Sequence, residues 1–97
     1  MTRSAYLVVD ARSTDPERMG EYRRLAQIAV EKLGGRYLVR GGAYEVIEGS
    51  WHPQRLVVLE FPNMDIARKF YDSPEYVAAR NARQEVSDFD ILLVEAY

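Results

Sequence analysis

Three runs of aliphatic residues dominate this sequence, and each of them is apolar at almost every position. They are AYLVVDA at residues 5–11, RLVVLEF at residues 55–61 and DILLVEAY at residues 90–97. A strand with one face in water alternates apolar and polar residues, whereas these runs carry aliphatic residues on both faces. The sequence therefore predicts strands of a sheet that is covered on both sides.

An amphipathic segment follows the first run. Between residues 16 and 33 apolar residues recur at steps of three and four, which predicts a helix with one buried face. Asp15 is a favourable N-cap for this helix, and Pro16 suits its first position. Gly34 and Gly35 then predict the left-handed turn that ends a helix.

The next two segments, RYLVR at residues 36–40 and AYEVIEG at residues 43–49, are interpreted as one strand interrupted at Gly41-Gly42. A polar turn then leads into the run at residues 55–61, which reads as the next strand.

A second helical region is predicted between residues 64 and 86. Asn63 can cap its start, and a break is expected near Ser73, because Pro74 disfavours helical geometry at the residue before it. The order is therefore β-α-β-β-α-β, the ferredoxin-like arrangement of an α+β protein. We expect a single domain over residues 1–97, with a four-stranded antiparallel sheet and helices on one face.

The second face of this sheet has no cover of its own. Left in water, its aliphatic residues would form an exposed patch of a kind that monomers rarely tolerate. We therefore expect a second copy of the chain to pack sheet against sheet. The result would be a homodimeric α/β barrel with a cleft.

Acidic residues near the strand ends are candidates for chemistry in this cleft. The first and third strands are expected to be side by side and parallel, which would place Asp10 and Glu60 at the same end and Glu95 at the opposite end. Two carboxylates near one cleft can serve acid–base chemistry if burial raises the pKa of one of them. The alternative is that they form structural ion pairs with neighbouring arginines. The arginines available for such pairs are Arg12, Arg36 and Arg40.

Tyr37 and Arg40 are the candidates for stabilising negative charge. A charge-assisted hydrogen bond from Arg40, together with the phenol of Tyr37, suits a small carboxylate or enolate-like ligand. In a regular strand the two side chains would lie on different faces, but a bulge at Gly41-Gly42 could re-aim them. We therefore predict Glu60 or Asp10 as base and Arg40 and Tyr37 as stabilisers, or else structural roles for all four.

Four further residues are weaker candidates for substrate binding. His52 is the only histidine and lies in a predicted loop, where most histidines are solvated. Tyr71, Tyr76 and Arg80 lie around the predicted helix break, where aromatic residues more often serve packing than ligand contact. Each of them could reach the cleft only if the fold turns it inward.

Several classes of function are excluded or disfavoured. The glycine pairs do not form a phosphate-binding loop, which lies between a strand and a helix. The net charge of -2 does not favour binding to nucleic acid or to an anionic membrane. The absence of cysteine excludes disulfides and thiolate chemistry. We expect no metal and no cofactor, and the lack of a signal-peptide pattern predicts a cytoplasmic protein.

Three motifs occur together in this chain: GGRYLVRGG at residues 34–42, LEFP at residues 59–62 and FYDSPEY at residues 70–76. In combination they resemble the family known as domain of unknown function 1330, over nearly the whole chain. The resemblance implies a cytoplasmic, typically bacterial dimeric α/β barrel. Its superfamily includes cofactor-independent monooxygenases, lactone isomerases and small-ligand binders.

This resemblance carries over no catalytic residues, since the family has no established reaction. The expected function is to bind or transform a small organic molecule in the cleft without a cofactor. The alternative is a non-catalytic ligand-binding or assembly module, in which the charged residues of the cleft form structural ion pairs.

Overall fold

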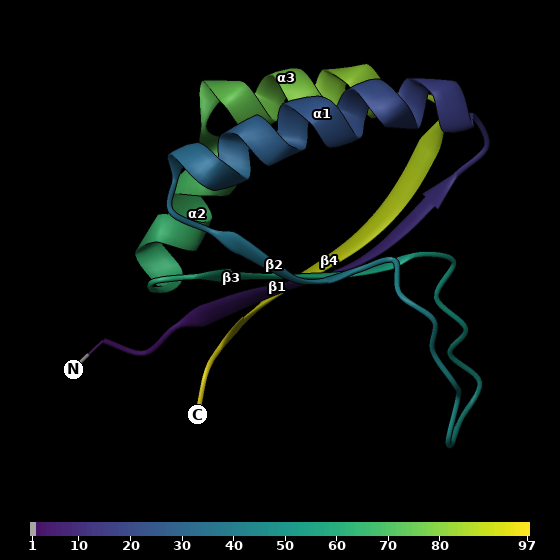
Figure 1. Ribbon diagram of the computed structural model, residues 1–97, viewed down its shortest axis with the longest axis horizontal. Coiled ribbons are helices and arrows are strands. Elements are labelled where there is room, and N and C mark those ends of the chain that lie inside the picture. Colours follow the sequence, from purple (N-terminus) through teal and green to yellow (C-terminus); the bar gives the residue numbers. More distant parts are fainter. Residues whose placement is uncertain (1) are drawn as a thin grey trace.

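The computed structural model describes residues 2–97 and follows the predicted order of elements, with the second helical region divided into two helices. The elements are β1 (Ala5–Ser13), α1 (Pro16–Lys32), β2 (Arg36–Arg40), β3 (Leu56–Phe61), α2 (Met64–Asp72), α3 (Pro74–Arg83) and β4 (Ser87–Glu95). The helices gather on one face of the sheet, and α1 and α3 lie side by side across it (Figure 1).

The helix boundaries follow from local capping. The Asp15 carboxylate accepts hydrogen bonds from the backbone N–H groups of Glu17 and Arg18, as expected for an N-cap. Gly34, with φ 77°, supplies the left-handed conformation after α1. The prediction for this helix is confirmed at both ends.

Ser73 separates α2 from α3. Its backbone is extended, its hydroxyl donates to the carbonyl of Phe70 at 2.7 Å, and it accepts from the N–H of Tyr76 at 3.2 Å. One side chain thus caps the end of α2 and the start of α3, with Pro74 at the first helical position. The predicted break is confirmed. The prediction that the helix continues to residue 86 is wrong, because Glu85 adopts φ 74° after α3 has ended at Arg83.

The four strands form an antiparallel sheet in the order β2-β3-β1-β4. β4 begins at Ser87, three residues before the predicted start, because β1 is also longer than predicted and the two strands pair as far as Ser13 opposite Ser87. The ferredoxin-like α+β class is confirmed.

The segment between β2 and β3, residues 41–55, contains no strand. The prediction of a strand over residues 43–49 is therefore wrong. These residues form a long excursion, here called the arm, that projects away from the helices at the lower right of Figure 1. The Tyr44 hydroxyl donates to the carbonyl of Pro53 at 2.6 Å and ties the two sides of the arm together.

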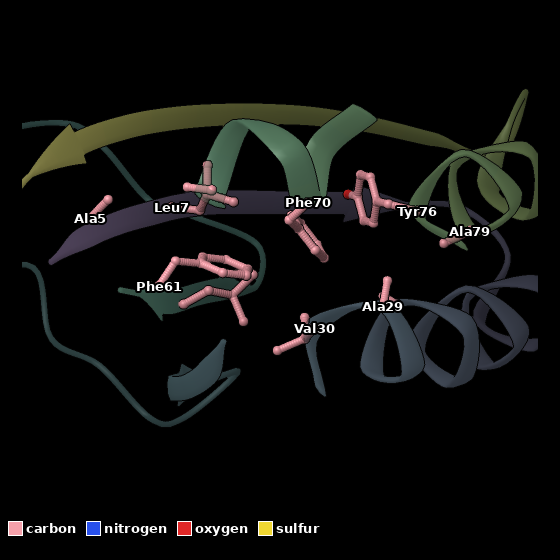
Figure 2. Packing of buried hydrophobic residues seen from close by; sticks show 11 residues of the cluster. Ala5, Leu7, Ala29, Val30, Phe61, Phe70, Tyr76 and Ala79 are labelled. Atoms are coloured by element: carbon pink, nitrogen blue, oxygen red, sulfur yellow. The ribbon is translucent and has the colours of Figure 1, made fainter. Parts of the chain in front are cut away.

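The core lies between the helices and the sheet. Alternate residues of β1, beginning with Ala5 and Leu7, point toward the helices and meet Phe61 of β3 and Phe70 of α2 (Figure 2). The Phe61 and Phe70 ring centroids lie 4.8 Å apart, and the Phe70 and Tyr76 centroids lie 4.5 Å apart. This row of rings joins α2 and α3 to the sheet.

On the other face of the sheet, here called the outer face, aliphatic residues of the edge strand β4 stay exposed. Leu92 is 68% exposed and Val94 is 47% exposed. On the arm, Ile47 and Trp51 are also exposed. The arm reaches this face at Asp10, through Trp51 and Gln54, and no helix described within residues 2–97 covers it.

Candidate ligand-binding site

A cavity of about 40 Å³ lies between the helix-facing side of the sheet and the helices. Its walls come from β1, β2, β3, β4 and all three helices, and most of them are apolar. The apolar residues around it include Leu7, Val9, Ala26, Val57 and Phe70. Such a space holds roughly three water molecules, given that one water needs about 10–15 Å³ of it.

Four tyrosines line this apolar cavity: Tyr22, Tyr37, Tyr71 and Tyr76. The hydroxyls of Tyr22 and Tyr76 hydrogen-bond to each other at 2.8 Å. Burial raises the pKa of Tyr22 well above its ordinary value, and burial also raises the pKa of Tyr37. These two phenols therefore remain protonated at neutral pH and can donate hydrogen bonds.

Three arginines complete the polar part of the lining: Arg23, Arg40 and Arg55. The Arg40 guanidinium lies over the ring of Tyr37, 4.1 Å from its centroid, and donates to Oε1 of Gln27 at 2.9 Å. A cation stacked on the face of a phenol has its position fixed by the ring. Tyr37 and Arg40, the predicted stabilisers, form a stacked pair at the wall of the cavity, and their role toward a ligand stays a prediction.

A register shift in β2 gives these two side chains a common face. The cross-strand pairs are Tyr37 with Leu59, Val39 with Val58, and Arg40 with Val57. Leu59 and Val57 both face the helices, so Tyr37 and Arg40 do as well. The irregularity lies between Tyr37 and Val39, not at Gly41-Gly42 where the sequence analysis placed it.

A second space, a groove of about 280 Å³, adjoins the cavity on the side of the arm. Its lining includes Gly41, Gly42, Tyr44 and Gln54, and it shares Ala11, Met19, Arg23 and Arg55 with the cavity. The two arginines therefore stand at the boundary between the interior and the groove.

Asp10 does not line the cavity. It lies on the outer face of β1, is only 5% exposed, and is surrounded by donors. These are Arg12 Nη1 at 2.8 Å, the backbone N of Gln54 at 3.0 Å and Trp51 Nε1 at 3.4 Å. Asp10 thereby fixes the arm to the sheet and holds the side chain of Arg12 in place.

Arg12 is the centre of a small charge cluster at this end of the sheet. Its guanidinium also lies 3.2 Å from Asp90 and 3.4 Å from Asp88. Partial desolvation lowers the pKa of Arg12, but these carboxylates and Asp10 outweigh that effect and raise it overall. Arg12 is among the arginines that the sequence analysis named as ion-pair partners.

Glu60 lies at the other end of the strand pair. β1 and β3 run antiparallel, with Tyr6 opposite Glu60 and Asp10 opposite Leu56. The expectation that Asp10 and Glu60 share one end is wrong, because neighbouring strands of an antiparallel sheet run in opposite directions. Glu95 pairs with Ala5, which itself lies opposite Phe61, so Glu95 is at the end of Glu60 and opposite to Asp10.

Glu60 also lies outside the cavity and accepts a hydrogen bond from Arg36 Nε at 2.6 Å. The two carboxylates predicted as bases therefore lie apart from each other and from the predicted stabilisers, each beside an arginine. A catalytic role for either one stays a prediction.

The four weaker candidates separate into two groups. Tyr71 and Tyr76 line the cavity. Arg80 packs on Tyr71, with its guanidinium 4.3 Å from the centroid of that ring, and is not among the residues that line the cavity. His52 lies exposed on the arm and lines neither the cavity nor the groove.

Comparison with known protein families shows to which family this chain belongs. The profile of the family described as Domain of unknown function (DUF1330) matches residues 4–97. The chain belongs to the DUF1330 family. A comparison with curated proteins gives no match.

Solved structures similar to this DUF1330 protein share its fold. The protein of unknown function RPA0582 from Rhodopseudomonas palustris is 18% identical with a TM-score of 0.77, covering 100% of this chain and 85% of its own. SnoaB, a cofactor-independent oxygenase from Streptomyces nogalater, is 12% identical with a TM-score of 0.67, covering 99% and 95%. A dimeric ferredoxin-like protein of unknown function from Thermobifida fusca is 14% identical with a TM-score of 0.60, covering 99% and 93%.

Two arginines of the DUF1330 site were not found by the sequence analysis, although the pattern contains a signal for each. Arg55 shares its parity with Val57 and Leu59 on the helix-facing side of β3. Arg23 lies four residues after Met19 on the buried stripe of α1. A charged residue in phase with a buried stripe is the signal that could have identified both of them.

Within residues 2–97, no group of three His, Asp or Glu side chains is placed to hold a metal ion. None of the helices in this part of the DUF1330 chain has the length and apolar character needed to span a membrane.

Proposed function

We propose that this protein is a cytoplasmic homodimer that binds a small organic molecule in the cavity between sheet and helices, without a cofactor. The observation that carries this proposal is the composition of the cavity wall. Four tyrosines and three arginines are among the residues that line a space inside an otherwise apolar core. A pocket that is mostly apolar, with a few convergent polar groups, is the usual form of a small-molecule site.

The lining favours binding over proton abstraction. Phenols with raised pKa values and guanidinium groups donate hydrogen bonds and stabilise negative charge. No carboxylate or imidazole is among the residues described around the cavity. A general base for the proposed ligand would have to be supplied from outside this wall, which supports the non-catalytic alternative.

If the protein transforms its ligand, Tyr37 and Arg40 are the groups we propose for stabilising an enolate-like intermediate. The stacked geometry holds both groups at one wall. Cofactor-independent oxygenation, the activity named for the structural relative SnoaB, would use such charge stabilisation. At 12% identity that relative supports the fold of the site and leaves the choice of reaction to experiment.

Filling the cavity should abolish ligand binding. Ala26 lies on α1, is buried, and lines the cavity, so the larger side chain of Ala26→Met would occupy the space. The measurement is a saturation-transfer NMR screen of small organic acids, amides and phenols against both proteins. We expect ligands of the wild-type protein to lose their signal with Ala26→Met, at a stability cost of about 1–3 kcal/mol from overpacking.

The control is Ala78→Met, the same change at an exposed position of α3. It should leave the set of bound compounds unchanged. The proposal would be overturned if no compound bound the wild-type protein, or if Ala26→Met, shown to be folded by circular dichroism, bound the same compounds equally well.

The dimer is proposed from the outer face. Its most exposed aliphatic residues, Leu92 and Val94, lie on the edge strand β4, and face-to-face packing of two sheets is the arrangement that buries such a surface. A carboxylate in place of the Leu92 side chain would put a charge in that interface. Leu92→Asp should therefore raise the dimer dissociation constant by roughly a hundredfold or more, as for an unpaired buried charge.

Sedimentation velocity over a range of protein concentrations measures this constant. Val77→Asp is the matched control, because Val77 is an exposed apolar residue of α3 on the side of the molecule that the helices occupy. A wild-type protein that sediments as a monomer at micromolar concentration would refute the dimer, as would equal dissociation by both variants.

A further inference from the structure

Arg23 and Arg55 come from different parts of the chain, and each lines both the cavity and the groove. Arg23 belongs to the buried side of α1, and Arg55 immediately precedes β3. Both are half-buried, and both line the two spaces. A ligand that occupied both spaces would therefore lie beside these two arginines.

Neither arginine is neutralised by the protein. The ion pairs found within residues 2–97 involve other cationic side chains, and no Asp or Glu is among the residues around the cavity or the groove. This contrasts with the chain as a whole, in which 15 acidic residues outnumber 13 basic ones. The boundary is therefore a local site of uncompensated positive charge in an acidic protein.

The backbone around Arg55 accommodates its guanidinium group. Gly41 has φ 71°, and a β-carbon at this position would overlap the guanidinium of Arg55. The N–H of Gly41 donates to the carbonyl of Leu56 at 2.8 Å, which holds the start of the arm against β3. The glycine thus lets the Arg55 head group lie against the main chain at the mouth of the cavity.

We propose that Arg23 and Arg55 bind the carboxylate of a short-chain organic acid whose apolar tail enters the cavity. The inference rests on the proposed small-molecule site and names its ligand class. A guanidinium group presents paired N–H donors that match the two oxygens of a carboxylate. The cavity beyond accepts an apolar tail of roughly three water-sized groups, and Val9, Val57 and Ala26 provide apolar contacts there.

The probes are butyrate and its neutral isostere butyramide, which differ in the charge of the head group and share the same tail. Isothermal titration calorimetry at low ionic strength measures both affinities, since screening weakens partly exposed charge interactions. We expect butyrate to bind at least tenfold more tightly than butyramide. Acetate, with a shorter tail, and octanoate, with a tail too long for the cavity, should both bind more weakly than butyrate.

Arg55→Gln and Arg23→Gln should each weaken butyrate binding by about tenfold or more and leave butyramide nearly unchanged, because each removes a charge-assisted hydrogen bond. Arg18→Gln is the matched control. It removes the same charge from an exposed position of α1, five residues before Arg23, and should change neither affinity.

Three outcomes would overturn the inference. Equal binding of butyrate and butyramide would remove the carboxylate clamp and leave the proposed small-molecule site standing. Binding of inorganic phosphate as tight as that of butyrate, with no dependence on tail length, would show a general anion site. If neither probe bound, the short-acid inference would fail. The proposed function would fail with it only if the wider NMR screen also found no ligand.

Discussion

The free energy of unfolding should fall by about 3–5 kcal/mol when Phe70 is replaced by Ala. Phe70 is 2% exposed and stands between Phe61 and Tyr76 in the row of rings that joins the helices to the sheet. Removing it enlarges the existing cavity, and the rigid β-strands on one side cannot collapse into the space. The loss is therefore expected at the upper part of the range for large-to-small substitutions.

Urea denaturation followed by circular dichroism measures this loss. Protein concentration must be held constant, since the stability of a dimer depends on it. Val77→Ala, at an exposed position of α3, is the control and should cost less than about 0.5 kcal/mol. A loss below about 1 kcal/mol for Phe70→Ala would show that the row of rings is not the centre of the core.

Asp10→Ala should lower the free energy of unfolding by about 2–3 kcal/mol and release the arm. The carboxylate of Asp10 receives hydrogen bonds from Arg12, Trp51 and Gln54, and the last two of these lie on the arm. Without the carboxylate these donors lose their acceptor, and Arg12 loses its shortest ion pair.

Trp51 is the only tryptophan, so its fluorescence reports directly on the arm. Its emission anisotropy should fall in Asp10→Ala, because the mutation removes the acceptor of the Trp51 Nε1 hydrogen bond. Asp88→Ala is the control, since its side chain is 83% exposed and contacts the same Arg12. If the stability of Asp10→Ala were unchanged while ligand binding or turnover was altered, the structural role of Asp10 would be contradicted and its role as a catalytic base favoured.

Local signals were sufficient for most of the fold. Asp15, Asn63 and Ser73 act as caps through hydrogen bonds within a few residues along the chain, so their positions could be read from neighbouring letters. The arm was mistaken for a strand because its alternating residues resemble β-structure. A strand needs a partner with free ladder positions, and this information is not local.

The candidate site was predicted only in part. Tyr37 and Arg40 were chosen for their chemistry, and both line the cavity, although the register shift that aligns them lies elsewhere than expected. Asp10 and Glu60 were placed together on the assumption of parallel strands. The antiparallel pairing of β1 with β3 separates them, and their parity puts them on the outer face.

The sequence by itself determined the order of elements and the helix caps, because each depends on residues close together in the chain. Its excess of aliphatic residues is the ground for the proposed dimer. The membership in the DUF1330 family also follows from the sequence, which matches the family profile over residues 4–97. Only the tertiary structure decided which charges meet. Arg23 and Arg55 are separated by more than a whole element in the chain, and only the folded structure brings both to the wall of one cavity. Strand direction and register place a side chain in the cavity or on the outer face, and both are set by long-range pairing.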